Sequence, residues 1–309
     1  MNQHHLSSNT QATLLMLSSC FCVALVSLFG KITEHHLGLP LALFSRFAAP
    51  AALMGLTLFV ITRHTLNHKN LGLHMIRALF VVLSQTALFF YLQHSSVLNA
   101  TLLYMTSPLF IPLILRLTYH TRIKKSQWAS LLIGFIGVVL ILKPNASLLT
   151  GYAFIGLLSG FFNALSQIAY YRVSQKSNPS SASFYLYVFS TLLVILPCLF
   201  FWISGSSITT NLHLNDPAML LILLTSVAMI SIGNQTCRGY AYRKAQQPSR
   251  LSPLMSSTLV FATLIDWLYF HHLPDMLSFV GAGLIVTSGI LLTLMTNRSS
   301  SHETSLNHA

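Results

Sequence analysis

Acidic residues are scarce in this chain. Its 309 residues include five Asp and Glu against 17 Lys and Arg, and charged residues make up only 7% of the sequence. A soluble domain carries about 25% charged residues. With so few charges and 53% hydrophobic residues, the chain cannot cover the surface of a water-soluble globule, and it is too apolar to be disordered. These deficits exclude an ordinary soluble enzyme and indicate a membrane protein that crosses the bilayer several times.

Motifs of catalysis and of ATP use are also missing. The sequence contains no Walker A loop, no HExxH and no GxSxG. The four cysteines fall inside apolar stretches, and the histidine pairs, such as His35-His36 and His271-His272, suit interfacial positions or a pH-sensing role. Nucleic-acid binding would need a soluble domain to carry it. We therefore expect no enzyme activity, no cofactor, no metal site and no nucleic-acid partner.

Apolar runs long enough to span a bilayer occur ten times. A spanning helix needs about 20 mostly apolar residues, and breaker segments such as Asn215-Asp216-Pro217 separate the runs. The predicted helices are Ala12–Lys31, Leu41–Thr62, Leu71–Leu92, Val97–Leu117, Gln127–Leu142, Tyr152–Arg172, Ser183–Ser204, Pro217–Cys237, Leu251–Phe270 and Met276–Thr296. The sequence thus predicts an all-α integral membrane fold with ten transmembrane helices.

The basic residues predict the orientation of these helices. With the N-terminus inside, 14 of the 17 Lys and Arg fall in inner segments, Lys31 and Lys143 fall in outer segments, and Arg46 lies within a helix. Because cations remain on the cytoplasmic face during insertion, both termini should be cytoplasmic. The polar segment 297–309 is expected to be a disordered cytoplasmic tail.

The two halves of the chain resemble each other. Ser84-Gln85-Thr86 aligns with Asn234-Gln235-Thr236, and Ser107–Val138 aligns with Thr258–Ile290. Chance similarity between apolar helices is the alternative explanation. Five helices are an odd number, so a second five-helix repeat must insert upside down, as in many secondary transporters. We predict two inverted repeats, 12–143 and 152–296, with a site at their interface.

Polar residues inside the predicted helices form three stripes, and such residues are candidates for function because they are costly in a membrane. The stripes are Ser231, Asn234, Gln235 and Arg238; Asn163, Gln167 and Tyr170; and Arg77, Ser84, Gln85 and Tyr91. They indicate either hydrogen bonding between helices or a water-filled cavity, and three stripes together favour the cavity. The candidate substrate-binding residues are Arg46, Arg77, Ser84, Gln85, Tyr104, Asn163, Gln167, Ser231, Asn234 and Gln235.

Asp266 is the only acidic residue inside a predicted helix. It could form a structural ion pair with Arg46, or it could titrate during proton coupling or neutralise a cationic group of a substrate. Arg46 and Arg77 point instead to a substrate with a carboxylate or phosphate, because the guanidinium fork matches both groups. Four glycines, Gly134, Gly137, Gly281 and Gly289, would pack either inside the fold or against a second copy in a homodimer.

Several ordered motifs resemble the drug/metabolite transporter superfamily of the EamA type, over roughly Thr13 to Thr296. They include Phe44-Ser45-Arg46-Phe47, Ser107-Pro108-Leu109-Phe110, Gln127-Trp128 and Gly137-Val138. The chain departs from the family pattern at Thr121 and His272, where the family usually has Glu, and near Leu259, where it has proline. The resemblance implies ten helices in two halves and transport of small organic metabolites across bacterial inner membranes.

The predicted function is therefore a secondary transporter that moves a small organic metabolite, such as an amino acid derivative, by alternating access. Its expected partners are this metabolite and the surrounding membrane lipids. Coupling to protons and exchange without an ion both remain open. Two other functions stay as alternatives: a flippase for a lipid or lipid-linked sugar on the same scaffold, and a membrane-embedded transferase.

Overall fold

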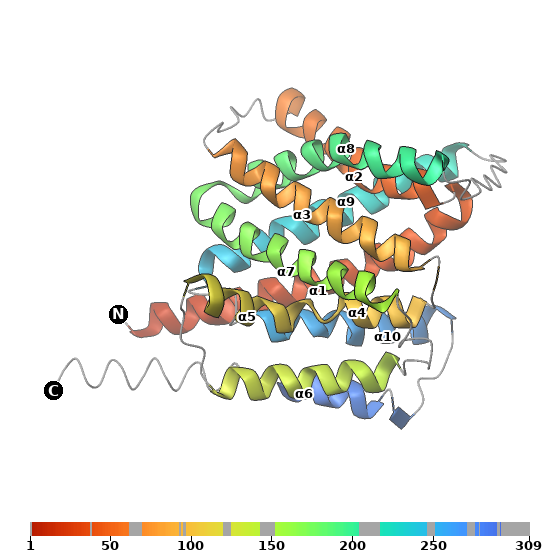
Figure 1. The fold of residues 1–309 in the computed structure, drawn as a ribbon. Coiled ribbons are helices and arrows are strands. Elements are labelled where there is room, and N and C mark those ends of the chain that lie inside the picture. The colour runs from red at the N-terminus through yellow and green to blue at the C-terminus, as the bar shows by residue number, and fades with distance from the viewer. Residues whose placement is uncertain are drawn as a thin grey trace.

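The computed structural model describes residues 2–37, 39–61, 70–92, 94, 97–119, 125–142, 152–203, 217–245, 251–270, 276–277, 279–288 and 291. All regular elements among these residues are helices, which confirms the predicted all-α class. The α-helices, labelled in Figure 1, are α1 (Asn2–Leu37), α2 (Leu39–Gly55), α3 (Leu71–Leu92), α4 (Val97–Tyr104), α5 (Ser107–Tyr119), α6 (Lys125–Leu142), α7 (Ala153–Lys176), α8 (Pro179–Ile203), α9 (Pro217–Lys244) and α10 (Ser257–Phe270). Three shorter segments carry no label in the figure, namely η1 (Leu56–Ile61), η4 (Ser252–Ser256) and the helix Phe279–Ser288.

Three predicted helices are not single α-helices. The helix predicted over Leu41–Thr62 changes from α2 to the π-helical segment η1 after Gly55. The stretch predicted as one helix, Val97–Leu117, is split into α4 and α5 by a turn at Met105 and Thr106. Pro108 explains this break, because proline lacks a backbone N–H and its ring clashes with the carbonyl four residues earlier, here that of Tyr104. The helix predicted from Leu251 starts instead as the 3₁₀ segment η4, which has a proline in its first turn, and α10 follows it.

Several helices are longer than the hydrophobic pattern predicts, and α1 and α9 exceed it by the most residues. α1 begins at Asn2 rather than Ala12, and α9 ends at Lys244 rather than Cys237. Hydropathy marks where a helix leaves the membrane, whereas backbone hydrogen bonding continues through polar residues of good helix propensity. The extension of α9 brings Arg238 and Tyr242 onto a continuous helix.

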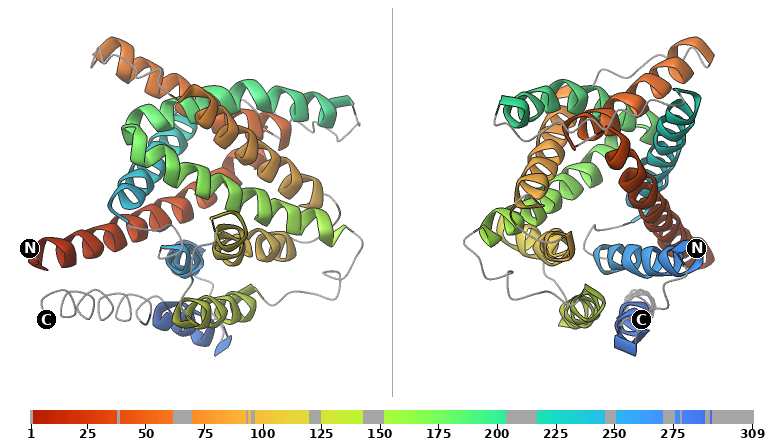
Figure 2. Two further views of the ribbon diagram at one scale, coloured as in Figure 1. Left: turned by 60° about the vertical axis from the view of Figure 1, so that its left-hand side comes forward. Right: turned by 90° about the vertical axis from the view of Figure 1, so that its right-hand side faces the viewer.

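Helices from the two halves of the chain pack against each other. α1 packs against α9, α3 against α7 and α2 against α8, while α10 lies against α1 (Figure 2). The central part of the molecule is therefore built jointly by residues before and after the connection between α6 and α7.

A separate pair of helices lies beside this central part. α6 runs along Phe279–Ser288 (Figure 1), where Ser130 Oγ donates to the carbonyl of Ser288 at 2.5 Å. A Cβ atom on Gly137 would lie 2.6 Å from the carbonyl oxygen of Gly281, which is closer than real Cβ contacts allow. These glycines therefore serve close packing inside the fold. Gly289 lies outside the described residues, and the homodimer stays a prediction.

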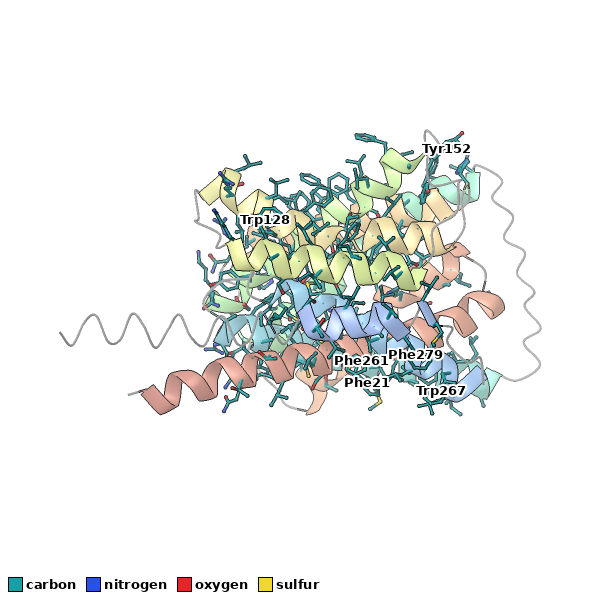
Figure 3. The ribbon with its side chains drawn as sticks, turned by 90° about the horizontal axis from the view of Figure 1, so that it is seen from below. Phe21, Trp128, Tyr152, Phe261, Trp267 and Phe279 are labelled. Carbon is teal, nitrogen blue, oxygen red and sulfur yellow. The ribbon has the colours of Figure 1, made fainter. Side chains whose placement is uncertain are left out.

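The outer surface of the helices is apolar. Five described helices are long and apolar enough to cross a membrane, Leu41–Leu58, Leu71–Tyr91, Ala153–Lys176, Pro179–Phe200 and Leu220–Lys244, and shorter apolar helices accompany them. Large side chains such as Ile203 and Phe154 are exposed on this surface. Figure 3 places Trp128 toward the end of the molecule where α1 begins, and Tyr152 and Trp267 at the opposite end. Aromatic residues at two such levels are typical of the membrane–water interfaces.

Candidate functional site

A polar cavity lies between the helices of the two halves. Its volume is about 130 Å³, counted as the space open to the centre of a water molecule, which is roughly ten times what one water needs. Residues of α1, α2, α3, α4, α5, α7, α8, α9, η4 and α10 line it. Among the described residues, the paired helices α6 and Phe279–Ser288 contribute nothing to the lining. Both halves of the chain therefore build one central site.

All ten residues predicted to bind substrate line this cavity, namely Arg46, Arg77, Ser84, Gln85, Tyr104, Asn163, Gln167, Ser231, Asn234 and Gln235. The structure thus brings residues of all three predicted stripes together, although Tyr91 of the α3 stripe is buried outside the lining. The role of the lining residues in binding remains a prediction. Asp266 is placed on α10, but its side chain lies outside the described part of the chain. Its titration and its pairing with Arg46 also remain predictions.

Arg77 connects the first half of the chain to the second. It lies in the second turn of α3 and is only 2% exposed. Its Nη1 donates to the carbonyl of Ala182 at 3.2 Å, its Nη2 donates to Gln235 Oε1 at 2.8 Å, and its guanidinium carbon lies 3.3 Å from the centre of the Tyr170 ring. Stacking and two hydrogen bonds fix the orientation of the guanidinium.

Arg238 is held differently. Its Nε donates to Ser19 Oγ at 3.0 Å, and Ser19 Oγ in turn donates to Asn234 Oδ1 at 2.6 Å. Ser19 comes from α1, so this chain of bonds joins α1 to α9 across the cavity wall. The spacing of Asn234 and Arg238 by four residues puts both on one face of α9.

The polar face of α7 forms a third network. Asn163 donates to Ser107 Oγ at 2.9 Å and Gln167 donates to Asn163 Oδ1 at 3.3 Å, while Tyr242 of α9 donates to Gln167 Oε1 at 3.0 Å. Ser84 makes a further bond between helices by donating to the carbonyl of Ser159 at 2.8 Å. The same residues therefore bond helices together and line the cavity.

The break between α4 and α5 positions two lining residues. Gly160 of α7 allows the break to approach closely, because a Cβ there would lie 2.5 Å from Thr106 Oγ1 and 2.6 Å from the carbonyl oxygen of Leu103. That same carbonyl accepts hydrogen bonds from the backbone N–H of Thr106 at 3.2 Å and from Thr106 Oγ1 at 2.6 Å, so the turn satisfies it where the helix is interrupted. Tyr104 and Ser107 flank the turn and both line the cavity.

One end of the bundle is closed by a buried apolar cluster next to the cavity. Its sixteen buried residues come from residues 12–20 of α1, from α5, α7 and α8, and from the end of α9 and the η4 region. At this end Lys244 of α9 donates to Gln11 of α1, and Arg243 donates to Asn178 Oδ1 at 3.4 Å. The cluster separates the cavity from the end of the molecule at which α1 begins.

Several lining residues were absent from the predicted site. Arg238 and Tyr170 share the stripes of the predicted residues, so their spacing already indicated them. Ser107 precedes Pro108, and the residue before a proline often ends a helix. This pair could therefore have indicated a break that exposes Ser107 to the cavity. Tyr187 and Thr258 lie on helices without a polar stripe, and their place in the lining follows only from the packing of α8 and α10.

The charge of the cavity is positive. Its described lining contains the guanidinium groups of Arg46, Arg77 and Arg238 and no carboxylate. Arginine stays protonated in proteins, so a bound group that accepts hydrogen bonds and carries negative charge fits this lining best.

Apolar helices around a polar central cavity define a multi-pass membrane protein of the transporter class. The chain belongs to the EamA-like transporter family, whose model matches residues 10–143 and again residues 150–295. Family membership indicates a transporter rather than an enzyme.

Curated relatives extend this similarity. A riboflavin transporter of Vibrio cholerae is 25% identical over 297 residues, covering 95% of this chain and 96% of that protein. A pseudopaline exporter of Pseudomonas aeruginosa is 26% identical and covers 74% of this chain and 77% of its own length. An S-adenosylmethionine uptake transporter of Rickettsia bellii is 21% identical and covers 74% of this chain and 75% of that protein.

The fold also matches a solved crystal structure. The two chains superpose with a TM-score of 0.69 at 17% identity, over 92% of this chain and 98% of the other. At this identity the match establishes a shared fold.

Proposed function

We propose that the protein is a secondary transporter that moves a small polar organic metabolite across the bacterial inner membrane by alternating access. One observation carries the proposal: the polar cavity is built by both halves of the chain and contains all ten polar residues that the sequence singles out. Substrate sites at the interface of two repeats are typical of secondary transporters. Relatives named as riboflavin, pseudopaline and S-adenosylmethionine transporters support a small organic substrate.

The proposed topology has ten transmembrane helices in two inverted repeats, 12–143 and 152–296, with both termini cytoplasmic. Basic side chains support this orientation. Lys176, Arg243 and Lys244 are exposed at the end of the bundle where α1 begins, and cations of this kind favour the cytoplasmic side. The apolar cluster would then close the cavity toward the cytoplasm.

Alternating access requires this closed end to open. Of the described hydrogen bonds at this end, the exposed one from Lys244 to Gln11 joins the two halves, and such a contact contributes little to stability. Separation of the halves here also exposes part of the buried apolar cluster, and new bonds to substrate in the cavity would have to offset that cost. Asp266 is the proposed group for proton coupling, and exchange without an ion is the alternative.

The test is solute flux into liposomes that contain the purified full-length protein, measured with labelled amino acids, nucleosides, vitamins and phosphate esters. Ser231→Phe places a bulky side chain in the cavity, whereas Thr225→Phe places the same side chain on an exposed face of the same helix. We expect Ser231→Phe to abolish flux and Thr225→Phe to retain it.

Equal flux in both variants would show that solute does not pass through the cavity. Scrambling of a fluorescent phospholipid by wild-type protein, with no flux of any solute, would replace the proposal with the lipid flippase.

A further inference from the structure

The positive charge of the cavity has no described counter-charge. Arg46, Arg77 and Arg238 line it, and among the described residues no carboxylate does. Isolated charges are expensive in a medium of low dielectric constant, so such sites are neutralised by a partner. Asp266 lies on α10, and its side chain is outside the described part of the chain.

The three arginines differ in how many of their guanidinium nitrogens are bonded to protein oxygens. Both terminal nitrogens of Arg77 donate to protein oxygens. Arg238 is 9% exposed and uses only Nε, in its bond to Ser19, so its two terminal nitrogens have no hydrogen-bond partner among the described residues. Arg46 likewise has no hydrogen bond or ion pair within the described part of the chain. Within the described residues, two of the three guanidinium groups therefore present unbonded donors to the cavity.

An unpartnered acceptor lies in the same cavity. Gln85 is 8% exposed, and its Oε1 has no hydrogen-bond partner in the described structure. A buried acceptor without a donor costs free energy unless a ligand or water supplies one. Among the described residues, the cavity therefore has no anionic group to pair with Arg238 and Arg46, and no N–H or O–H donor to bond Gln85 Oε1.

We propose that the transported metabolite is a small organic anion that also carries a hydrogen-bond donor. Its carboxylate or phosphate is bound by the terminal nitrogens of Arg238 together with Arg46, and its donor is bound by Gln85. Arg77 holds the halves together and leaves the charge recognition to the other two arginines. This inference rests on the proposed transport function, because it names the substrate class of the same cavity.

The test measures binding to purified full-length protein by thermal shift, and flux in liposomes, with pairs of solutes that differ only in charge. Each carboxylate is paired with its amide, for example glutamate with glutamine, and each phosphate ester with its alcohol, for example glycerol 3-phosphate with glycerol. Lysine serves as a cationic control. The carboxylate and phosphate arms then distinguish the two sources of the oxyanion.

We expect charged members of one arm to bind and their uncharged counterparts to fail. Arg238→Gln should weaken that binding by roughly tenfold to a hundredfold, as expected for loss of hydrogen bonds to a charged group. Arg243→Gln, on the same helix but exposed outside the cavity, should leave binding unchanged.

Arg46→Gln provides a variant that should fold even if Arg238→Gln does not, since it breaks no described hydrogen bond. It should weaken anion binding and leave the melting temperature of the ligand-free protein unchanged or higher. Flux of neutral or cationic solutes that is insensitive to both substitutions would overturn the anion assignment while preserving the transporter. Absence of flux for every class of solute would instead overturn the transporter and the assignment together.

Discussion

The close approach of α7 to the break between α4 and α5 leads to a quantitative prediction for Gly160→Ala. The new Cβ would lie 2.6 Å from the carbonyl oxygen of Leu103, whereas ordinary van der Waals contact begins at 3.4 Å. Overpacking of this kind costs about 1–3 kcal/mol, and the higher helix propensity of alanine returns about 1 kcal/mol. We therefore expect a net loss of about 1 kcal/mol, or roughly 2–4 °C in melting temperature.

Gly283→Ala is the matched control. It lies in Phe279–Ser288, and a Cβ there would meet no atom within 4 Å. Only the propensity effect of about 1 kcal/mol remains, so the melting temperature should rise by about 2–4 °C. The two variants should thus shift the melting temperature of the detergent-purified protein in opposite directions.

Gly160→Ala should also reduce transport. The turn that it displaces lies between Tyr104 and Ser107, and both of these residues line the cavity. Flux in liposomes should fall for Gly160→Ala and stay at the wild-type level for Gly283→Ala. If Gly160→Ala melts at or above the temperature of Gly283→Ala, the tight contact does not exist and the reasoning is refuted.

Three further predictions concern the buried polar groups and the topology. Arg77→Lys should lower the melting temperature, because an ammonium group cannot stack on Tyr170 and bond both Ala182 and Gln235 as the guanidinium does. An unchanged melting curve would contradict the role of Arg77 in connecting the two halves. Asp266→Asn should remove the pH dependence of flux in folded protein, and unchanged pH dependence would leave Asp266 only a structural role. Alkaline phosphatase fused after residue 309 should be inactive in cells, whereas high activity would place the C-terminus outside.

The helical class, and the grouping of polar residues around one cavity, could be predicted from the sequence because both depend on the pattern of residues within a helix. Lipid excludes unpaired backbone groups, so long apolar runs fold as helices whatever surrounds them. Polar residues three or four positions apart share a face, and a face that cannot point to lipid must point inward. Arg77, Asn163 and Gln235 were therefore recognisable before the packing was known.

The remaining features depend on contacts between distant segments. Tyr187 lines the cavity, and its hydroxyl donates to the carbonyl of Ser231 at 2.8 Å. No spacing within α8 reveals this contact. The free terminal nitrogens of Arg238 likewise follow from its bond to Ser19, 219 residues away. The helix ends were predicted wrongly for another reason. The length of an apolar run matches the thickness of the membrane, whereas the helix itself continues into the polar residues beyond it.

The contacts of Arg77 also bear on how the chain is synthesised. Its two hydrogen-bond acceptors, Ala182 and Gln235, follow it by 105 and 158 residues. At a translation rate of about 5–20 residues per second, the second partner emerges roughly 8–30 s after α3. During that interval α3 carries a guanidinium without these partners. Arg77 lies in the second turn of α3, close enough to the helix end for its long side chain to reach the membrane interface, so the cost stays below the about 2.5–3.5 kcal/mol of the bilayer centre. The early turns of α3 therefore supply a position in which the arginine can remain hydrated until the second half of the chain brings its partners.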